Sequence, residues 1–156
     1  MSRRYRIFRM KIKSKVFILF FLLPTLLLCN KKYSITDVQI QAQLKSNGSM
    51  EVSESRTYKF KGSFKYAFIK LSKSKGISYS NISVSERKNY FVENDTNSPQ
   101  TFTITDHENH IEVRWYYRAR NESRIFTLNY TVNDVVIRNK DVAQVYHQFI
   151  GDEWKK

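Results

Sequence analysis

Residues 38–60 read VQIQAQLKSNGSMEVSESRTYKF, two runs of alternating side chains on either side of a polar turn. Between residues 38 and 44 every second residue is apolar and the residues between them are glutamines, which is typical of a strand with one wet face. The pair Asn47-Gly48 is the strongest short-range signal for a hairpin, because a tight reversal needs positive φ at both central residues. This stretch therefore predicts a β-hairpin with one buried face.

The second run carries two charges on its apolar face. Glu54 and Arg56 share the phase of Val52 and Tyr58, so their side chains point toward the predicted core. Because charged groups are rarely buried without partners, we expect a satisfied structural ion pair at the rim of the fold, made by these two residues or with a neighbouring strand. The alternative is a carboxylate that is presented to a ligand.

The period of two continues through most of the chain. Further strands are expected at residues 77–84 with a bulge near Asn81, at 102–104, at 111–118, at 126–132 and at 135–137. Residues 64–71 are expected to form a short strand or an irregular crossover, and residues 141–150 a helical turn or two. Several short strands with polar turns predict a mainly β fold, an antiparallel β-sandwich that is immunoglobulin-like in general shape.

The first 32 residues combine a basic segment with an apolar run. Seven Lys and Arg residues precede residues 16–29, an apolar run of 14 residues that is shorter than the roughly 17–25 of a spanning helix. This order is typical of an export signal, and the charge bias sends the rest of the chain across the membrane. We therefore expect a signal peptide or an uncleaved hydrophobic signal-anchor helix over residues 1–32 and an extracytoplasmic domain over residues 33–156.

Cys29 closes the apolar run and is the sole cysteine of the chain. One interpretation is lipidation of this thiol, although Leu28 stands where bacterial lipoprotein signals have a small residue. The other is a buried thiol with no function, since free Cys behaves as a small hydrophobe. With one cysteine the exported part forms no internal disulfide, so its core has to supply the stability.

The net charge of +13 is concentrated in the N-terminal segment. Nine of the 27 Lys and Arg residues and none of the 14 Asp and Glu residues lie in residues 1–32, which leaves 18 basic against 14 acidic residues beyond it. A nucleic-acid partner needs clustered cations and access to the polymer. We therefore exclude nucleic acid and expect the membrane as the partner of the N-terminal segment.

The chain carries few residues in patterns typical of catalysis. His107 and His110 flank Glu108, but no third His or Cys is near them, so we interpret this segment as a polar hairpin tip that binds no metal. There is no Gly-rich phosphate loop, no G-x-S-x-G motif and no plausible cysteine nucleophile. The sequence therefore predicts a domain that is not an enzyme and has no cofactor.

Aromatic residues make up 15% of the chain. In Trp115-Tyr116-Tyr117 the rings alternate between the two faces of one strand, so Tyr116 meets solvent or a neighbouring strand. An exposed Tyr116 is a candidate for an aromatic binding face, because exposed rings stack on sugars or anchor protein partners. The alternative is that Tyr116 takes part in cross-strand packing while Trp115 and Tyr117 are core residues.

Two sets of motifs frame the predicted domain. The first is YSITDVQI (33–40), SNGSMEVSE (46–54) and RTYKF (56–60) with Gly62 and Phe64, and the second is DVAQVY (141–146) and IGDEW (150–154). Together they resemble a family of predicted bacterial membrane proteins known as domain of unknown function 2207 (DUF2207). The resemblance spans residues 33–154. The chain departs from the pattern at YAFIK (66–70), where Arg and Pro are expected, and at His147, where the family often has Trp.

The resemblance implies an extracytoplasmic β-rich domain followed by transmembrane helices and a cytoplasmic tail, with no known activity. Because this chain stops at Lys156, we expect a fragment or a truncated product that is incomplete at its C-terminus. Two function classes stay open. The first is a non-catalytic cell-envelope domain, held at the membrane on its extracytoplasmic side, that binds a protein or an envelope polymer. The second is a secreted hydrolase or metal-binding accessory domain.

Overall fold

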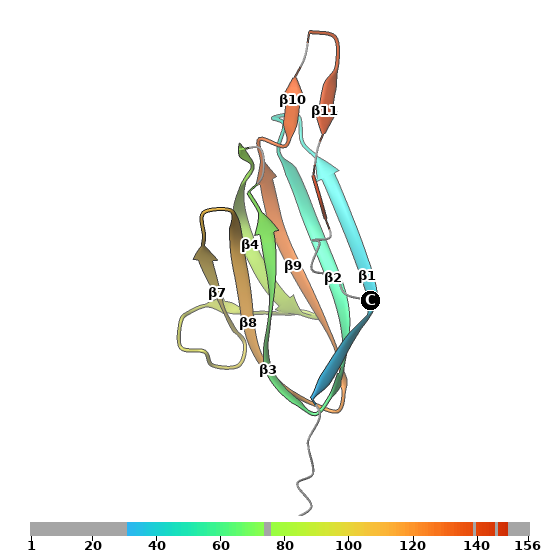
Figure 1. Cartoon of the computed structure of the whole chain (residues 1–156), viewed down its shortest axis with the longest axis vertical. Helices are drawn as coiled ribbons and strands as arrows, with labels where there is room; N and C mark the ends of the chain where they lie inside the picture. The colour runs from blue at the N-terminus through green and yellow to red at the C-terminus, as the bar shows by residue number, and fades with distance from the viewer. Residues whose placement is uncertain (1–30, 74–75, 139, 146, 150–156) are drawn as a thin grey trace, which may run out of the picture.

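The chain folds into two main β-sheets and a small separate strand pair (Figure 1). A computed structural model describes residues 31–73, 76–138, 140–145 and 147–149, so the predicted signal or anchor helix and Cys29 lie outside the described residues. Within those ranges, no helix has the length and apolar character that crossing a membrane requires. The strands are β1 Lys32–Leu44, β2 Met50–Lys61, β3 Ser63–Ser72, β4 Ser78–Glu86, β5 Asn89–Tyr90, β6 Val92–Glu93, β7 Thr101–Asp106, β8 His110–Arg120, β9 Ser123–Asn133, β10 Val136–Arg138 and β11 Ala143–Val145.

The strand order confirms a mainly β fold with antiparallel sheets. The five-stranded sheet has the order β1-β2-β9-β4-β5 and the four-stranded sheet the order β3-β8-β7-β6. One pair departs from the prediction, because β6 and β7 run parallel. The strand β9, late in the sequence, lies between β2 and β4.

The hairpin predicted at residues 38–60 is confirmed, and Leu44 pairs with Met50 at its end. Its turn differs from the expectation, because only Gly48 has positive φ (84°) and Asn47 does not. The Gly48 amide donates to the Lys45 carbonyl at 3.0 Å, and Asn47 Oδ1 accepts from the Ser49 amide at 3.0 Å. A longer loop with one left-handed glycine replaces the two-residue turn, as in hairpins that combine a type I turn with a bulge.

The chain passes between the two sheets at neighbouring corners. It passes from β2 to β3 at Gly62 (φ 92°) and from β8 to β9 at Asn121 (φ 51°). The Gly62 amide donates to Asn121 Oδ1 at 2.7 Å, and the Asn121 amide donates to the Gly62 carbonyl at 3.2 Å. The positive φ of Gly62 favours glycine at this corner, and a Cβ there would also lie 3.2 Å from Lys31 Cγ, a contact close enough that the lysine side chain would have to shift.

Aromatic rings fill the space between the sheets. Tyr58 of β2 meets Trp115 of β8 with ring centroids 6.4 Å apart, and Phe126 of β9 meets Trp115 at 5.7 Å and Tyr117 at 4.7 Å. These side chains are buried, and together with apolar residues of both sheets they form one core. Trp115 and Tyr117 are therefore core residues, as the alternation of β8 predicts.

Two local predictions agree with the structure, the second of them in its strand alternative. The bulge near Asn81 is confirmed, because the β4–β9 register shifts between Ser80 and Ser83 and Asn81 has a φ of 52°. Residues 64–71 belong to a strand, β3, with a bulge between Phe64 and Tyr66.

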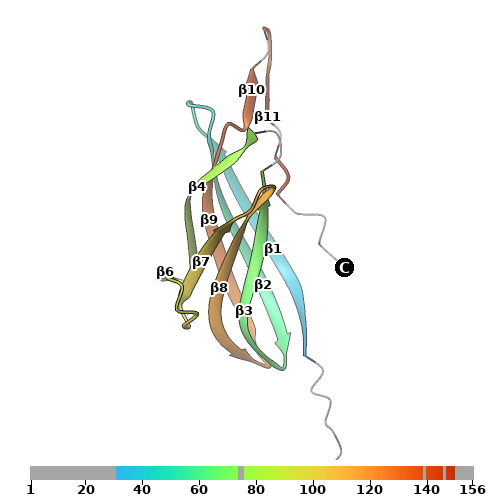
Figure 2. The same cartoon turned by 60° about the vertical axis from the view of Figure 1, so that its left-hand side comes forward.

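The helical turn predicted at residues 141–150 is wrong over its described part. Residues 143–145 form β11, which pairs with β10 through Val136 and Val145. The β-branched Val142 and Val145 favour a strand, and β10 offers a pairing edge that a local helix signal ignores. The pair β10–β11 projects past the end of both sheets (Figures 1 and 2).

Candidate functional site

A cluster of rings and a guanidinium lies on the outer side of the four-stranded sheet. We call it the aromatic face, and it consists of Tyr66 and Phe68 on β3 with Arg114 and Tyr116 on β8. Because residues alternate along a strand, the inward placement of Trp115 and Tyr117 sends these β8 neighbours outward. Tyr66 and Phe68 are 49% and 42% exposed, whereas Tyr116 is half-buried.

Strand register brings the aromatic face together. Tyr66 pairs with Tyr116 and Phe68 with Arg114, and the Tyr66 and Tyr116 ring centroids are 6.4 Å apart. The Arg114 guanidinium carbon lies 5.0 Å from the Tyr66 centroid and 5.6 Å from that of Phe68. Both contacts fall within the range of cation–π attraction. The structure therefore places Tyr116 in cross-strand contact, beside two rings that stay exposed.

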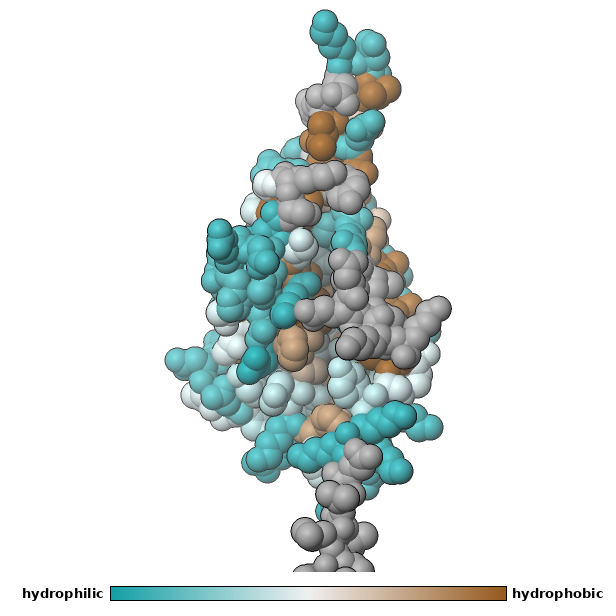
Figure 3. Space-filling model, viewed as in Figure 1, coloured by the Kyte–Doolittle hydropathy of each residue, from teal (hydrophilic) through white to brown (hydrophobic). Residues whose placement is uncertain are grey.

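Positive charge surrounds these rings. Arg114 donates from Nε and Nη2 to Glu112 Oε1 at 3.0 and 2.7 Å. Arg118 and Arg120 continue the outward row of β8 and are exposed, and Lys70 pairs in register with Glu112. In the space-filling view, side chains of hydrophobic or intermediate hydropathy (tan and white) over β3 are bordered by hydrophilic ones (teal) (Figure 3). A flat surface of this kind can stack a ring-shaped group and attract carboxylates or phosphates.

Glu54 and Arg56 lie in the interior, between the sheets. The Arg56 guanidinium bonds Glu54 Oε1, and the side chains of Arg56 and Glu54 are 15% and 1% exposed. Burial raises the pKa of Glu54, while the charge and hydrogen bond of Arg56 oppose that rise. The adjacent cavity, lined by apolar residues such as Ile69 and Trp115, has a volume of about 10 Å³, roughly the space of one water molecule. The carboxylate is therefore not presented to a ligand.

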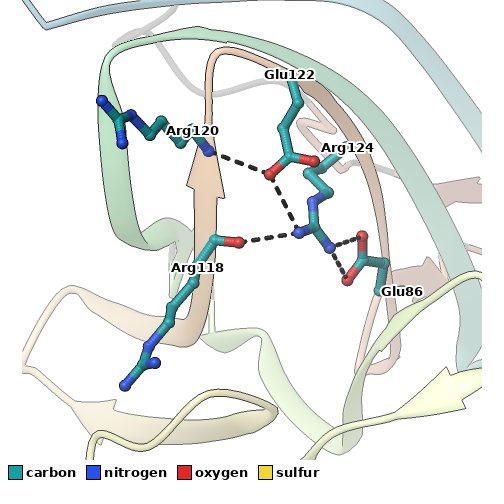
Figure 4. Close-up of polar contacts among 5 residues, drawn as sticks. All are labelled: Glu86, Arg118, Arg120, Glu122 and Arg124. Carbon is teal, nitrogen blue, oxygen red and sulfur yellow. Dashed lines mark hydrogen bonds and ion pairs between the residues drawn. The ribbon is translucent and has the colours of Figure 1, made fainter.

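A second charged network, which the sequence analysis did not predict, ties the sheets at their corner (Figure 4). Arg124 Nη1 on β9 donates to both carboxylate oxygens of Glu86 at 2.8 and 3.0 Å. Its Nη2 donates to the Arg118 carbonyl at 2.9 Å and to Glu122 Oε1 at 3.2 Å. The hydrogen bond from Arg124, followed by one from the Arg120 amide, lowers the pKa of Glu122. No local motif could reveal this network, because Glu86 and Arg124 are 38 residues apart.

The tip of the β7–β8 hairpin gathers potential metal ligands. Donor atoms of His107, His110 and Glu112 all lie within 4.8 Å of one another, and the two imidazole rings stack with centroids 4.4 Å apart. Glu108 is the acid between the two histidines in the sequence, whereas the strand alternation brings Glu112 to them. His147 packs elsewhere, against Tyr79 and Tyr130.

Comparison with known proteins identifies a family and no individual relative. Neither the curated proteins nor the solved structures contain a match to this chain. The family described as predicted membrane protein (DUF2207), N-terminal domain, matches residues 34–156. This match confirms the resemblance found in the sequence and covers both main sheets. The chain therefore belongs to the DUF2207 family of predicted membrane proteins.

Proposed function

We propose that this domain is a non-catalytic binding module of the cell envelope, held at the membrane on its extracytoplasmic side, whose aromatic face binds an anionic polysaccharide. The observation that carries the proposal is the exposed pair Tyr66 and Phe68 with Arg114 against both rings. We also infer that the two sheets form a β-sandwich that is immunoglobulin-like in general shape, since their inward faces share one core.

Charge favours an anionic ligand for the aromatic face. Arg114, Arg118, Arg120 and Lys70 stand on the outer side of the four-stranded sheet, and Glu112 there is already bonded to Arg114. Exposed rings bind sugar faces, and guanidinium groups bind carboxylates and phosphates. A polymer with both kinds of group fits this surface better than a neutral glycan.

The two described hollows give little support to hydrolysis. An enzyme needs at least two titratable groups around an accessible space. The cavity at Glu54 is interior, and the groove of about 390 Å³ on the five-stranded sheet is lined mainly by uncharged side chains, with Glu51 as its acid. Both hollows therefore favour the binding module over the secreted hydrolase.

Titration calorimetry with the full chain in detergent tests the proposal, with polygalacturonate as the anionic probe and dextran as the neutral one. We expect binding of polygalacturonate only, and a loss of about tenfold or more in affinity for Tyr66→Ala with Phe68→Ala, because stacking and cation–π contacts are removed. The matched control is Ile125→Ala, which removes a side chain that is 48% exposed on the outer side of the five-stranded sheet.

Equal binding of dextran would contradict the proposed charge preference. Equal losses in the double variant and in Ile125→Ala would contradict the assignment to the aromatic face. Binding to vesicles of anionic lipid in place of polygalacturonate would overturn the proposed polymer and favour a membrane surface.

A further inference from the structure

The β7–β8 hairpin holds two histidines in register. The His107 amide donates to the His110 carbonyl at 2.9 Å, which closes the hairpin around Glu108 and Asn109. Residues that face each other across an antiparallel pair project to the same side of the sheet. Glu112 follows His110 by two residues, so it lies on that side as well. Backbone geometry thus brings three ligand-bearing side chains to one place.

We propose that His107, His110 and Glu112 form a binding site for a divalent transition-metal ion of the zinc type. Their donor atoms lie within 4.8 Å of one another. Ligands of one zinc ion lie about 2.1 Å from it, so two of them can be at most about 4.2 Å apart. Rotation of the exposed His107 side chain would close this difference.

Neighbouring side chains orient two of the three ligands. Asn109 Oδ1 lies 2.7 Å from His110 Nδ1 and accepts a hydrogen bond from it in the Nδ1–H tautomer, which leaves the Nε2 lone pair of His110 for the metal. Arg114 holds Glu112 through Oε1, which leaves Oε2 for the metal. Bonds of this kind to the second nitrogen of a histidine and to a ligating carboxylate are typical of metal sites.

The ligand set selects the class of ion. Two imidazoles and one carboxylate suit zinc, nickel or copper, whereas magnesium and calcium prefer sites built from oxygen. Three protein ligands leave one position of a tetrahedral zinc ion for water or for a group from a partner.

Calorimetric titration of the untagged full chain in detergent with ZnCl₂ tests the site, with MgCl₂ as the metal control. We expect one equivalent of zinc to bind and magnesium to give no signal. Replacing His107 by Ala or Glu112 by Gln is expected to weaken zinc binding at least about tenfold, as loss of even an orienting partner does. Glu108→Gln is the matched control, because it removes the other carboxylate of the same hairpin and is expected to keep the affinity of the parent chain.

Cobalt supplies a second, spectroscopic readout of metal binding that does not depend on the heat of binding measured by calorimetry. Co²⁺ bound by imidazole and carboxylate is expected to give a visible absorption band that disappears on addition of zinc. No zinc binding by the parent chain, or equal losses for Glu108→Gln and Glu112→Gln, would overturn the site. The probe is the metal alone, so these outcomes are independent of polysaccharide binding by the aromatic face.

Discussion

Glu54 places an acidic group in the interior, between the two sheets. Its Oε1 atom accepts from Arg56, whereas Oε2 is buried with no hydrogen-bond partner among the described residues. Desolvation of both charges opposes the attraction between them, so such a pair adds little net stability over apolar side chains of similar size. Losing one partner is much more destabilising, because a buried charge is then left uncompensated.

Arg56→Leu is therefore expected to lower the free energy of unfolding at pH 7 by about 3–5 kcal/mol. The double variant Glu54→Leu with Arg56→Leu is expected to lie within about 1 kcal/mol of the parent chain or to be more stable. Urea unfolding followed by tryptophan fluorescence measures both. A double variant that is less stable than Arg56→Leu alone would contradict the expectation that apolar side chains can replace the ion pair without loss of stability.

The pH dependence has a definite sign. Burial raises the pKa of Glu54, so the folded chain holds this proton more tightly than the unfolded chain does. Protonation of Glu54 therefore stabilises the folded chain fully when the pH is below the ordinary pKa of a glutamate. This stabilisation is lost as the pH rises through the raised pKa of the folded chain. In Arg56→Leu the buried Glu54 carboxylate has lost the opposing charge, and protonation at lower pH neutralises it. We therefore expect the stability of the Arg56→Leu variant, relative to that of the double variant, to recover when the pH is lowered from 7 to 5.

At the level of elements, Arg124 connects strands of different sheets. Its partners are Glu86 at the end of β4, the Arg118 carbonyl on β8 and Glu122 in the β8–β9 turn. A planar guanidinium can serve several acceptors in fixed directions, which a lysine ammonium cannot do as well. The network therefore fixes the angle at which β8 turns into β9 between the sheets.

Arg124→Met is expected to lower the free energy of unfolding by about 1–2 kcal/mol, a value reduced from that of buried charged hydrogen bonds because the site is partly exposed. Arg124→Lys is expected to recover less than half of this loss. The matched control is Arg120→Met, since the Arg120 guanidinium points away from the network (Figure 4). Thermal unfolding of the three variants measures the effect, and an equal loss in Arg120→Met would mean that net charge, not geometry, is responsible.

On the scale of the whole molecule, the two outer surfaces differ in chemistry. On the five-stranded sheet, hydroxyl and amide groups bond one another, as in Ser55 with Thr127 at 2.7 Å and Asn133 with Ser80 at 3.1 Å. On the four-stranded sheet, the rings of Tyr66 and Phe68 are exposed, as are Arg118 and Arg120. Groups that satisfy one another have little left to offer a ligand, so the second surface is the better candidate for binding.

The proposed location is tested by protease accessibility. In spheroplasts that express the full chain, we expect added protease to degrade the β domain while a cytoplasmic marker stays intact, because the basic segment before the apolar run is expected to retain the N-terminus inside. Mass spectrometry of the membrane fraction then reports whether Cys29 is lipidated, removed or unmodified. Protection of the domain until the membrane is lysed would contradict an extracytoplasmic side.

Much of the fold could be predicted because side-chain alternation is a local signal. The hairpin at residues 38–60, the buried row of β8 and the bulge at Asn81 each follow from a short stretch of sequence. Two predictions failed, the helical turn at residues 141–150 and the two-residue turn at Asn47-Gly48, and each failure has a physical cause. Residues 141–150 carry an Asp that can begin a helix, but residues 143–145 pair with β10 as a strand. The turn at Gly48 needed one left-handed residue instead of two, because its loop is longer than a two-residue reversal.

The sequence by itself determined which side chains face the core, the mainly β class and the family, since a period of two and a set of local motifs suffice for each. It could not determine which strands are neighbours. Only the tertiary structure places β9 between β2 and β4, brings Tyr66 beside Tyr116 and joins Glu86 to Arg124. The physical reason is that alternation fixes the face on which a side chain lies, whereas the contacts of that face depend on pairing between distant segments. The candidate binding face is a product of that pairing, whereas the candidate metal site lies within the single hairpin of β7 and β8.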